Sequence, residues 1–320
     1  MKESDRISID PFRSMLYTNG DLLAGFDPSD PLSYASTYDF RVYREWVSTG
    51  GEHASHIHAV ARAIHDSSIS DALDEFVTGR PVVGIMGGHQ MTRSSRADSP
   101  YRRVVRLARD LAAAGYLVLS GGGPGAMEAT HFGARTSGMS ESDVGRCLVR
   151  LEDSVGFPEG LGRMVRRDGT IDEALLRRLH AWQSPAFEML EATEPATASL
   201  AVPTWHYGHE PPTPFATHIA KYFQNSVRED GLLAVAAAGL VFFEGRAGTI
   251  QEVFQDAAQN YYGRSGVISP MVFIGVELWT HAYPVWGVLQ KLFGEEQMLC
   301  LTDSIEEAAD FIASHPPRRY

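Results

Sequence analysis

Three glycine-rich segments each follow a short apolar run, and turns of this kind hold phosphate groups in many α/β proteins. The segments are Gly84–His89, Ser120–Glu128 and Phe243–Glu252. A glycine lets the backbone approach a phosphate closely, and the helix that follows offers free N–H groups and the positive end of its dipole. One such turn is often a plain strand-to-helix connection, but three in one sheet favour a site for a phosphorylated ligand. The candidate binding residues are Gly87, Gly88, Gly121, Gly122, Gly123, Gly125, Glu128, Gly245, Arg246, Ala247, Gly248 and Thr249.

The third segment also places a carboxylate near the expected phosphate. Thr249 stands where a helix is expected to begin, so its hydroxyl and the neighbouring N–H groups can bind a phosphate. Glu252 follows three residues later and projects from the same helical face, one turn deeper. A carboxylate about a ribose's length from a phosphate suits cleavage of an N-glycosidic bond, because it can stabilise an oxocarbenium-like centre or activate water. The plainer alternative is a glutamate that only complements the helix dipole.

The second segment fits the dinucleotide fingerprint G-x-G-x-x-A through Gly121, Gly123 and Ala126. This segment follows the second expected strand, however, whereas the fingerprint follows the first strand of its βαβ unit. No lysine follows a tyrosine by four positions, so the sequence has no Tyr-x-x-x-Lys pair. Both observations disfavour a dehydrogenase.

The elements that must position these segments form an alternating pattern from residue 81 onward. Continuous apolar strands that are each followed by a helix predict a doubly wound, Rossmann-like parallel sheet covered on both faces. Residues 1–80 contain no β-rich run and predict a mostly helical N-terminal extension to a nucleotide-binding domain over 81–320, with a polar insertion at about 152–195. We expect strands over 81–86, 116–120, 147–151, 199–202, 239–243, 271–276 and 298–301, and helices over 101–114, 126–137, 215–236, 249–262, 284–292 and 304–314.

Composition limits the partners of this 320-residue chain. Its formal net charge of −12 repels a phosphate backbone, so general nucleic-acid binding is disfavoured. No stretch approaches the roughly 20 apolar residues of a membrane span. The only cysteines, Cys147 and Cys300, lie in apolar stretches that predict strands, and two buried thiols fit a reducing, cytoplasmic compartment. Only three lysines are present, so a Schiff-base mechanism has few candidates, and we expect no organic cofactor.

The segments Ser120–Glu128 and Glu244–Glu252 together resemble the Lonely Guy (LOG) family of Rossmann-fold nucleotide-binding proteins. The family's hallmark in the third turn is P-G-G-x-G-T-x-x-E, and its members are often mislabelled lysine decarboxylases. The resemblance covers about residues 81–310. Within the family, the N-terminal region and the loop Pro203–His209 most resemble the longer bacterial nucleotide 5′-monophosphate nucleosidases. The resemblance implies hydrolysis of a nucleoside 5′-monophosphate to a free base and ribose 5-phosphate.

The family pattern implies roles for several residues of this chain. Glu252 matches the catalytic carboxylate without a gap, and Gly245, Gly248 and Thr249 match the phosphate cradle. An essential arginine lies within M-x-x-R-K in the family. Arg228 matches it after a shift of one residue, and would contact the nucleotide and help to stabilise the departing base.

Two positions depart from that pattern. Glu244 stands where the family has proline, and Arg246 where it has the second glycine. An acid beside a phosphate site is unfavourable unless it is paired, and Arg246 is the obvious partner. Alternatively, Arg246 adds a charge-assisted bond to the phosphate, worth about 1.5–3 kcal/mol. The departures leave open a different substrate or a loss of activity.

The loop Pro203–His209 invites two interpretations. His206 and His209 could be metal ligands, but a loop rich in Tyr, Gly and Pro does not enforce the geometry that a metal needs. We therefore expect no metal. The favoured interpretation is a loop that closes over the base, with Trp205, Tyr207 and His209 on the base side.

The sequence thus predicts a homo-oligomeric hydrolase that binds a nucleoside 5′-monophosphate. Aromatic residues over 254–262 suggest a subunit contact on one helix. The alternative is a non-catalytic nucleotide or cofactor carrier of the same fold. Retention of Glu252 beside Thr249 favours the enzyme, whereas the changes at Glu244 and Arg246 favour the carrier.

Overall fold

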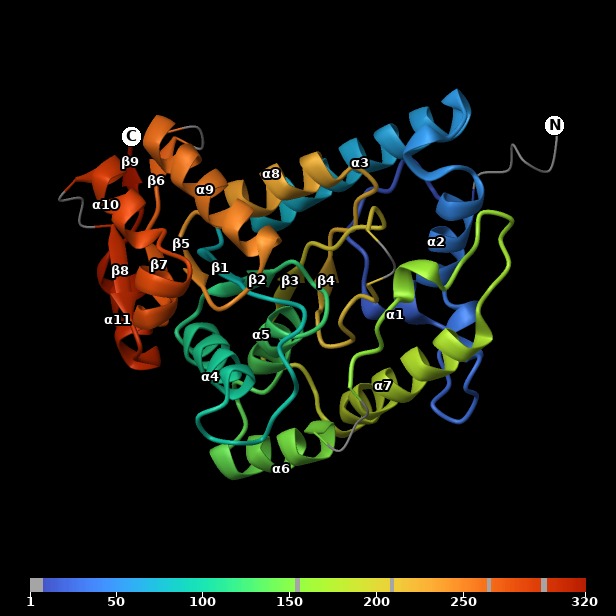
Figure 1. Cartoon of the computed structure of the whole chain (residues 1–320), viewed down its shortest axis with the longest axis horizontal. Coiled ribbons are helices and arrows are strands. Elements are labelled where there is room, and N and C mark those ends of the chain that lie inside the picture. The colour runs from blue at the N-terminus through green and yellow to red at the C-terminus, as the bar shows by residue number, and fades with distance from the viewer. Residues whose placement is uncertain (1–7, 153–155, 208–209, 264–265, 295–297) are drawn as a thin grey trace.

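A seven-stranded parallel sheet forms the centre of the molecule in a computed structural model (Figure 1). The structure describes residues 8–152, 156–207, 210–263, 266–294 and 298–320. The strand order is β4-β3-β2-β1-β5-β7-β8, and every neighbouring pair is parallel. These strands are β1 Val82–Met86, β2 Leu117–Ser120, β3 Ser199–Ala201, β4 His218–Ile219, β5 Gly239–Phe242, β7 Met271–Ile274 and β8 Leu299–Thr302. A short antiparallel pair joins β6 Val267–Ile268 to β9 Arg318–Arg319.

The chain builds this sheet outward in both directions from β1, which confirms the doubly wound prediction. Strands β2, β3 and β4 extend to one side, and the chain then returns to place β5 on the other side of β1. The switch point between β1 and β5 opens a crevice at the carboxyl ends of the strands, where open α/β sheets bind their ligands. The first and third glycine-rich segments leave β1 and β5 at this point.

Helices cover both faces of the sheet. Val82 and Met86 of β1 pack in one core with side chains of α3, α8 and α9, whereas Val83 and Ile85 pack in a second core with α4, α5 and α11. Figure 1 shows α3, α8 and α9 on one side of the sheet, and α4 and α5 on the other. The helices are α1 Asn19–Leu23, α2 Tyr38–Ser48, α3 His56–Val77, α4 Pro100–Ala113, α5 Ala126–Arg135, α6 Glu141–Glu152, α7 Glu173–Ala192, α8 Asn225–Val235, α9 Ala247–Tyr262, α10 Trp286–Phe293 and α11 Ile305–Ser314.

Two of the expected elements are wrong. The segment around Cys147 forms helix α6 rather than a strand, because Val144, Leu148 and Leu151 fall at helical spacing and bury one stripe. Cys147 itself is only half-buried there. The long helix expected over 215–236 is instead strand β4, an extended segment and then α8, which begins at Asn225. The apolar residues before Asn225 are buried by the N-terminal region, so their pattern does not report a helix.

The N-terminal region is helical, as expected, and packs onto the sheet. Tyr17 and Ile219 exchange two backbone hydrogen bonds, Tyr17 N to Ile219 O at 2.9 Å and Ile219 N to Tyr17 O at 2.7 Å, so this region lengthens the edge at β4. Phe40 and Ile69 lie in the same core as β1 and β5. Helix α7 lies within residues 152–195. No helix in the described ranges is long and apolar enough to cross a membrane.

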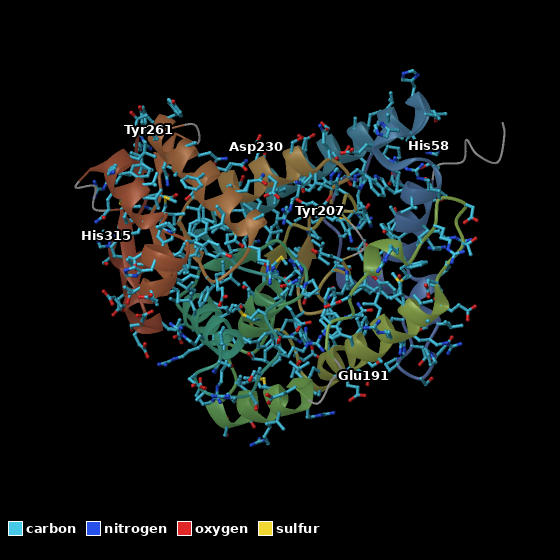
Figure 2. The ribbon with its side chains drawn as sticks, viewed as in Figure 1. His58, Glu191, Tyr207, Asp230, Tyr261 and His315 are labelled. Atoms are coloured by element: carbon cyan, nitrogen blue, oxygen red, sulfur yellow. The ribbon has the colours of Figure 1, made fainter. Side chains whose placement is uncertain are left out.

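We expect the protein to be a dimer or larger at micromolar concentration. Phe254, Tyr261 and Tyr262 of α9 are 40%, 48% and 68% exposed, and Figure 2 shows Tyr261 at the outer end of that helix. Exposed aromatic side chains on one helix are typical of a subunit contact. Light scattering measures the mass, and replacing Phe254 and Tyr262 by serine should shift it toward the monomer. A wild-type monomer would contradict this prediction.

Candidate functional site

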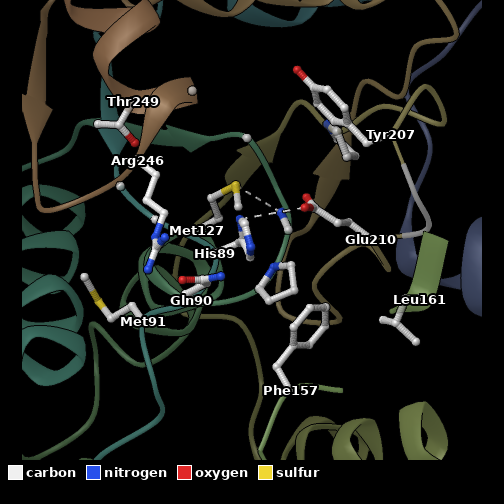
Figure 3. Close-up of a pocket in the computed structure, with 18 of the residues that line it drawn as sticks. His89, Gln90, Met91, Met127, Phe157, Leu161, Tyr207, Glu210, Arg246 and Thr249 are labelled. Carbon is white, nitrogen blue, oxygen red and sulfur yellow. Dashed lines mark hydrogen bonds and ion pairs between the residues drawn. The ribbon is translucent and has the colours of Figure 1, made fainter. Parts of the chain in front are cut away.

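A cavity of about 1090 Å³ lies where the carboxyl ends of β1, β2 and β5 meet (Figure 3). The turns after these strands, the first turns of α8 and α9, and residues 156–162 of the insertion all line it. Its volume is at the upper end of the range for small-molecule sites. The structure brings together twelve of the predicted residues at its wall: Gly87, Gly88, Gly121, Gly123, Gly125, Tyr207, Arg228, Arg246, Ala247, Gly248, Thr249 and Glu252.

Backbone hydrogen bonds join the three glycine-rich turns into one unit. Gly88 N donates to Glu244 O at 2.9 Å, and Ala126 N donates to Gly88 O at 3.2 Å. Gly125 has φ +70°, and a Cβ there would lie 2.5 Å from Gly88 O, so no other residue fits this close approach. The turns therefore hold a fixed relative position around the pocket.

A buried histidine supports the second turn from behind. His131 Nε2 lies 2.8 Å from Ser120 Oγ, and His131 Nδ1 lies 3.0 Å from Ser199 Oγ. Burial lowers the pKa of His131 to about 3, so the ring is neutral at pH 7. Ser120 Oγ accepts a hydrogen bond from Gly122 N at 3.1 Å. Gly122 therefore shapes the turn rather than lining the pocket.

The N-terminus of α9 has the features of a phosphate cradle. Ala247, Gly248 and Thr249 begin the helix at the pocket wall, and no side chain among the described residues caps their N–H groups. Gly245 does not line the pocket, but a Cβ there would collide with the side chain of Thr249. Arg246 is exposed at the wall, and within the described residues it forms no ion pair with Glu244. Pairing with Glu244 is therefore not seen among the described residues, and contact of Arg246 with a phosphate stays a prediction.

Glu128 does not line the pocket, which corrects the prediction that it contacts the ligand. Its side chain is fully buried and accepts hydrogen bonds from Arg93 Nε and Nη2, both at 2.7 Å, and from Tyr101 Oη at 2.8 Å. The Arg93 guanidinium lies 4.1 Å from the ring centre of Trp182, and both residues line the pocket. Glu128 thus positions Arg93, which sequence reasoning missed.

Arg228 and Glu252, from facing helices, both reach the pocket. Arg228 Nε donates to Val202 O at 2.8 Å, and its Nη2 lies only 2.5 Å from where a Cβ on Gly121 would stand. Glu252 is 9% exposed, and burial raises its pKa to about 8, with the nearby Arg228 opposing the rise and Glu229 adding to it. A carboxyl group with a pKa this high inside a cleft is typical of catalytic sites.

The loop after β3 is only partly as expected. Trp205 is 1% exposed, stacks on Phe223 with ring centres 4.6 Å apart, and donates from Nε1 to Asp39 Oδ1 at 2.9 Å. It belongs to the core and does not line the pocket, so the base-stacking prediction for Trp205 is wrong. Tyr207 does line the pocket, and its hydroxyl accepts a hydrogen bond from Asn225 Nδ2 at 2.9 Å. His209 lies outside the described residues.

The N-terminal region anchors α8 from outside the pocket. Asp66 of α3 accepts hydrogen bonds from Phe223 N at 3.0 Å and Gln224 N at 2.8 Å, so it satisfies N–H groups at the start of α8. Lys221, just before this point, forms a fully buried ion pair with Asp39 at 2.5 Å. Lys221 does not line the pocket, and no other lysine does in the described part of the chain. The described residues likewise contain no group of three or more His, Cys, Asp or Glu placed to hold a metal.

Comparison with known proteins gives structural likenesses only. No family model and no curated protein matches the chain. The molybdenum cofactor binding protein of the phototrophic bacterium Rippkaea orientalis is 13% identical, covering 73% of this chain and 96% of its own, with a TM-score of 0.44. The molybdenum cofactor carrier protein of Chlamydomonas reinhardtii is 14% identical, covering 73% and 97%, with a TM-score of 0.41. Likenesses at this level leave the activity to be argued from the site itself.

Proposed function

We propose that the chain is a cytoplasmic hydrolase that cleaves the N-glycosidic bond of a nucleoside 5′-monophosphate, giving the free base and ribose 5-phosphate. One observation carries the proposal: the uncapped N-terminus of α9 and the buried carboxyl of Glu252, one turn further along, share a single pocket with Arg228. The resemblance of the second and third turns to the LOG family supports the same reaction.

Each part of the pocket has a distinct role in this reaction. The N–H groups of Ala247–Thr249 and the Arg246 guanidinium hold the phosphate. The ribose then lies over the first turn of α9, with its glycosidic carbon beside Glu252. As the bond breaks, the Glu252 carboxylate offsets the positive charge that develops on the ribose, or activates the attacking water. Arg228 stabilises the departing base. The scheme needs neither a metal nor an organic cofactor.

The role proposed for Glu252 predicts how activity depends on pH. A pKa of about 8 leaves only about one molecule in ten ionised at pH 7. If the carboxylate is the active form, kcat/KM for a monophosphate should rise from pH 6 to pH 9, with its midpoint near 8. Initial rates of base release across this range test the prediction. Activity that falls over the same range would show that the protonated acid acts instead.

A non-catalytic carrier of the same fold is the second candidate, because the charged side chains of the site are largely neutralised. Glu229 neutralises Arg228 across a 2.6 Å ion pair, and Glu252 is mostly uncharged at pH 7. A carrier would bind a phosphorylated ligand in this pocket and release it unchanged. Incubation with purine and pyrimidine monophosphates, followed by chromatography for free base, separates the candidates. Tight binding without base release would favour the carrier.

A further inference from the structure

One carboxylate oxygen of Glu229 has no hydrogen-bond partner in the part of the chain that the structure describes. The residue is 4% exposed, and its Oε1 accepts from Arg228 Nη1 at 2.6 Å and Asn225 Nδ2 at 3.4 Å. Its Oε2 is buried and has no partner among the described residues. A buried oxygen of a charged group is costly to leave unpaired, and native proteins rarely do so. The missing donor is therefore expected to come from a ligand.

The surroundings of Glu229 hold its side chain at the pocket wall. Glu229 lines the pocket, and its partner Arg228 is itself fixed by Val202 O at 2.8 Å. Asn225 is tied to the Tyr207 hydroxyl at 2.9 Å. The Glu229 carboxylate is thus a pre-positioned acceptor rather than a mobile surface group.

Glu252 is the other buried carboxylate at the pocket wall, and the proposed function places it beside the glycosidic carbon. Glu152 and Glu210 at the same wall either have hydrogen-bond donors or face solvent. Glu152 accepts hydrogen bonds from Ser94 and Ser95. The side chain of Glu210 is one-third exposed and lies 3.8 Å from His89 Nδ1. Of Glu152, Glu210 and Glu229, only Glu229 is both buried and short of a donor among the described residues.

We propose that Glu229 binds the ribose of the nucleotide, with Oε2 accepting a hydrogen bond from a ribose hydroxyl. The inference rests on the proposed function, which places the phosphate at the start of α9 and the glycosidic carbon beside Glu252. Helices α8 and α9 pack against each other, so Glu229 faces the same part of the ligand as Glu252. Among the donors of a nucleotide, the hydroxyls lie nearest to that carbon. The phosphate has no donor when ionised and would be repelled.

Binding of nucleotides that lack one hydroxyl tests this inference. The parent protein carries Glu252→Gln, so that bound nucleotide is not consumed, and calorimetry gives Kd for AMP, 2′-deoxy-AMP, 3′-deoxy-AMP and IMP. A charge-assisted hydrogen bond predicts that loss of the bonded hydroxyl weakens binding about 10-fold to 100-fold. The quantity compared between variants is the ratio of Kd for the deoxy nucleotide to Kd for AMP. Adding Glu229→Met should reduce this ratio to less than about threefold, and Glu229→Gln should reduce it in part.

Asp230→Asn is the matched control. This neighbouring carboxylate is exposed on α8 (Figure 2), bonds Gln255 Nε2 at 2.5 Å and does not line the pocket, so the ratio should persist. Thermal unfolding checks that the variants fold, and the glutamine variant keeps the test valid if the methionine variant does not.

Several outcomes would overturn the inference. Equal binding of AMP and both deoxy nucleotides by the parent would do so, as would a ratio that survives both changes at Glu229. If Glu229→Met instead removes a difference between AMP and IMP, the residue contacts the base amine and the ribose assignment is wrong. If the ratio behaves as expected but wild-type protein releases no base, the inference stands and the proposed hydrolysis falls. If none of the four nucleotides binds, both fall.

Discussion

Replacing Glu252 by glutamine should lower base release from a nucleoside 5′-monophosphate by roughly 10²–10³-fold or more. Glutamine keeps the shape and much of the hydrogen bonding of the side chain, but it cannot carry the negative charge that offsets the developing cation. Nucleotide affinity should change little, because the proposed phosphate site lies at Ala247–Thr249 and Arg246 rather than at this carboxyl. Initial rates and Kd measured on the same protein separate the two effects.

Stability provides an independent check on the same variant. The folded pKa of Glu252 is about 8 and its ordinary value is 4.5, so the folded state retains a proton that the unfolded chain loses. Stability of the wild type therefore falls as pH rises from 4.5 to 8. Glu252→Gln has no such loss, and its Tm relative to wild type should rise by a few degrees between pH 5 and pH 8. If Glu252→Gln releases base at the wild-type rate, Glu252 has no catalytic role and only complements the dipole of α9.

The fold was predictable because most of its signals are local. Runs such as 82–86 and 239–242 are apolar at every position, which is what a strand covered on both faces requires, and the glycines that follow mark each turn. Where burial comes from an unforeseen neighbour, the local pattern misleads. The apolar residues of 216–223 are buried in a core shared with the N-terminal region, and that contact spans some 200 residues of sequence.

The candidate site likewise contains some residues that local sequence predicts and others that it does not. Thr249 and Glu252 lie one helical turn apart, so their relation could be deduced from spacing alone. Glu128 looked like part of a glycine-rich turn, and only the fold brings Arg93 to it. Glu229 directly follows Arg228 in the sequence, but nothing local shows that one of its oxygens is buried without a donor. The sequence does not predict which polar groups pair with each other across helices.

Replacing Lys221 by methionine should destabilise the protein by about 3–5 kcal/mol. The ammonium group is fully buried and lies 2.5 Å from Asp39 Oδ1, whose side chain is also fully buried. Methionine fills a similar volume but removes the ammonium group from the Asp39 carboxylate, which keeps the donors Trp205 Nε1 at 2.9 Å and Tyr34 Oη at 3.0 Å. Loss of the cation from a buried ion pair is the dominant cost. Urea unfolding at pH 7 measures the change.

Lys291→Met is the matched control, since it makes the same substitution at an exposed position on α10. Its effect should stay within about 0.5 kcal/mol. Adding Asp39→Asn to Lys221→Met removes the buried negative charge as well and should recover part of the lost stability. If Lys221→Met is as stable as Lys291→Met, the Lys221–Asp39 ion pair contributes nothing to the free energy of unfolding. The N-terminal region would then have to hold the start of α8 by Asp66 and apolar packing alone.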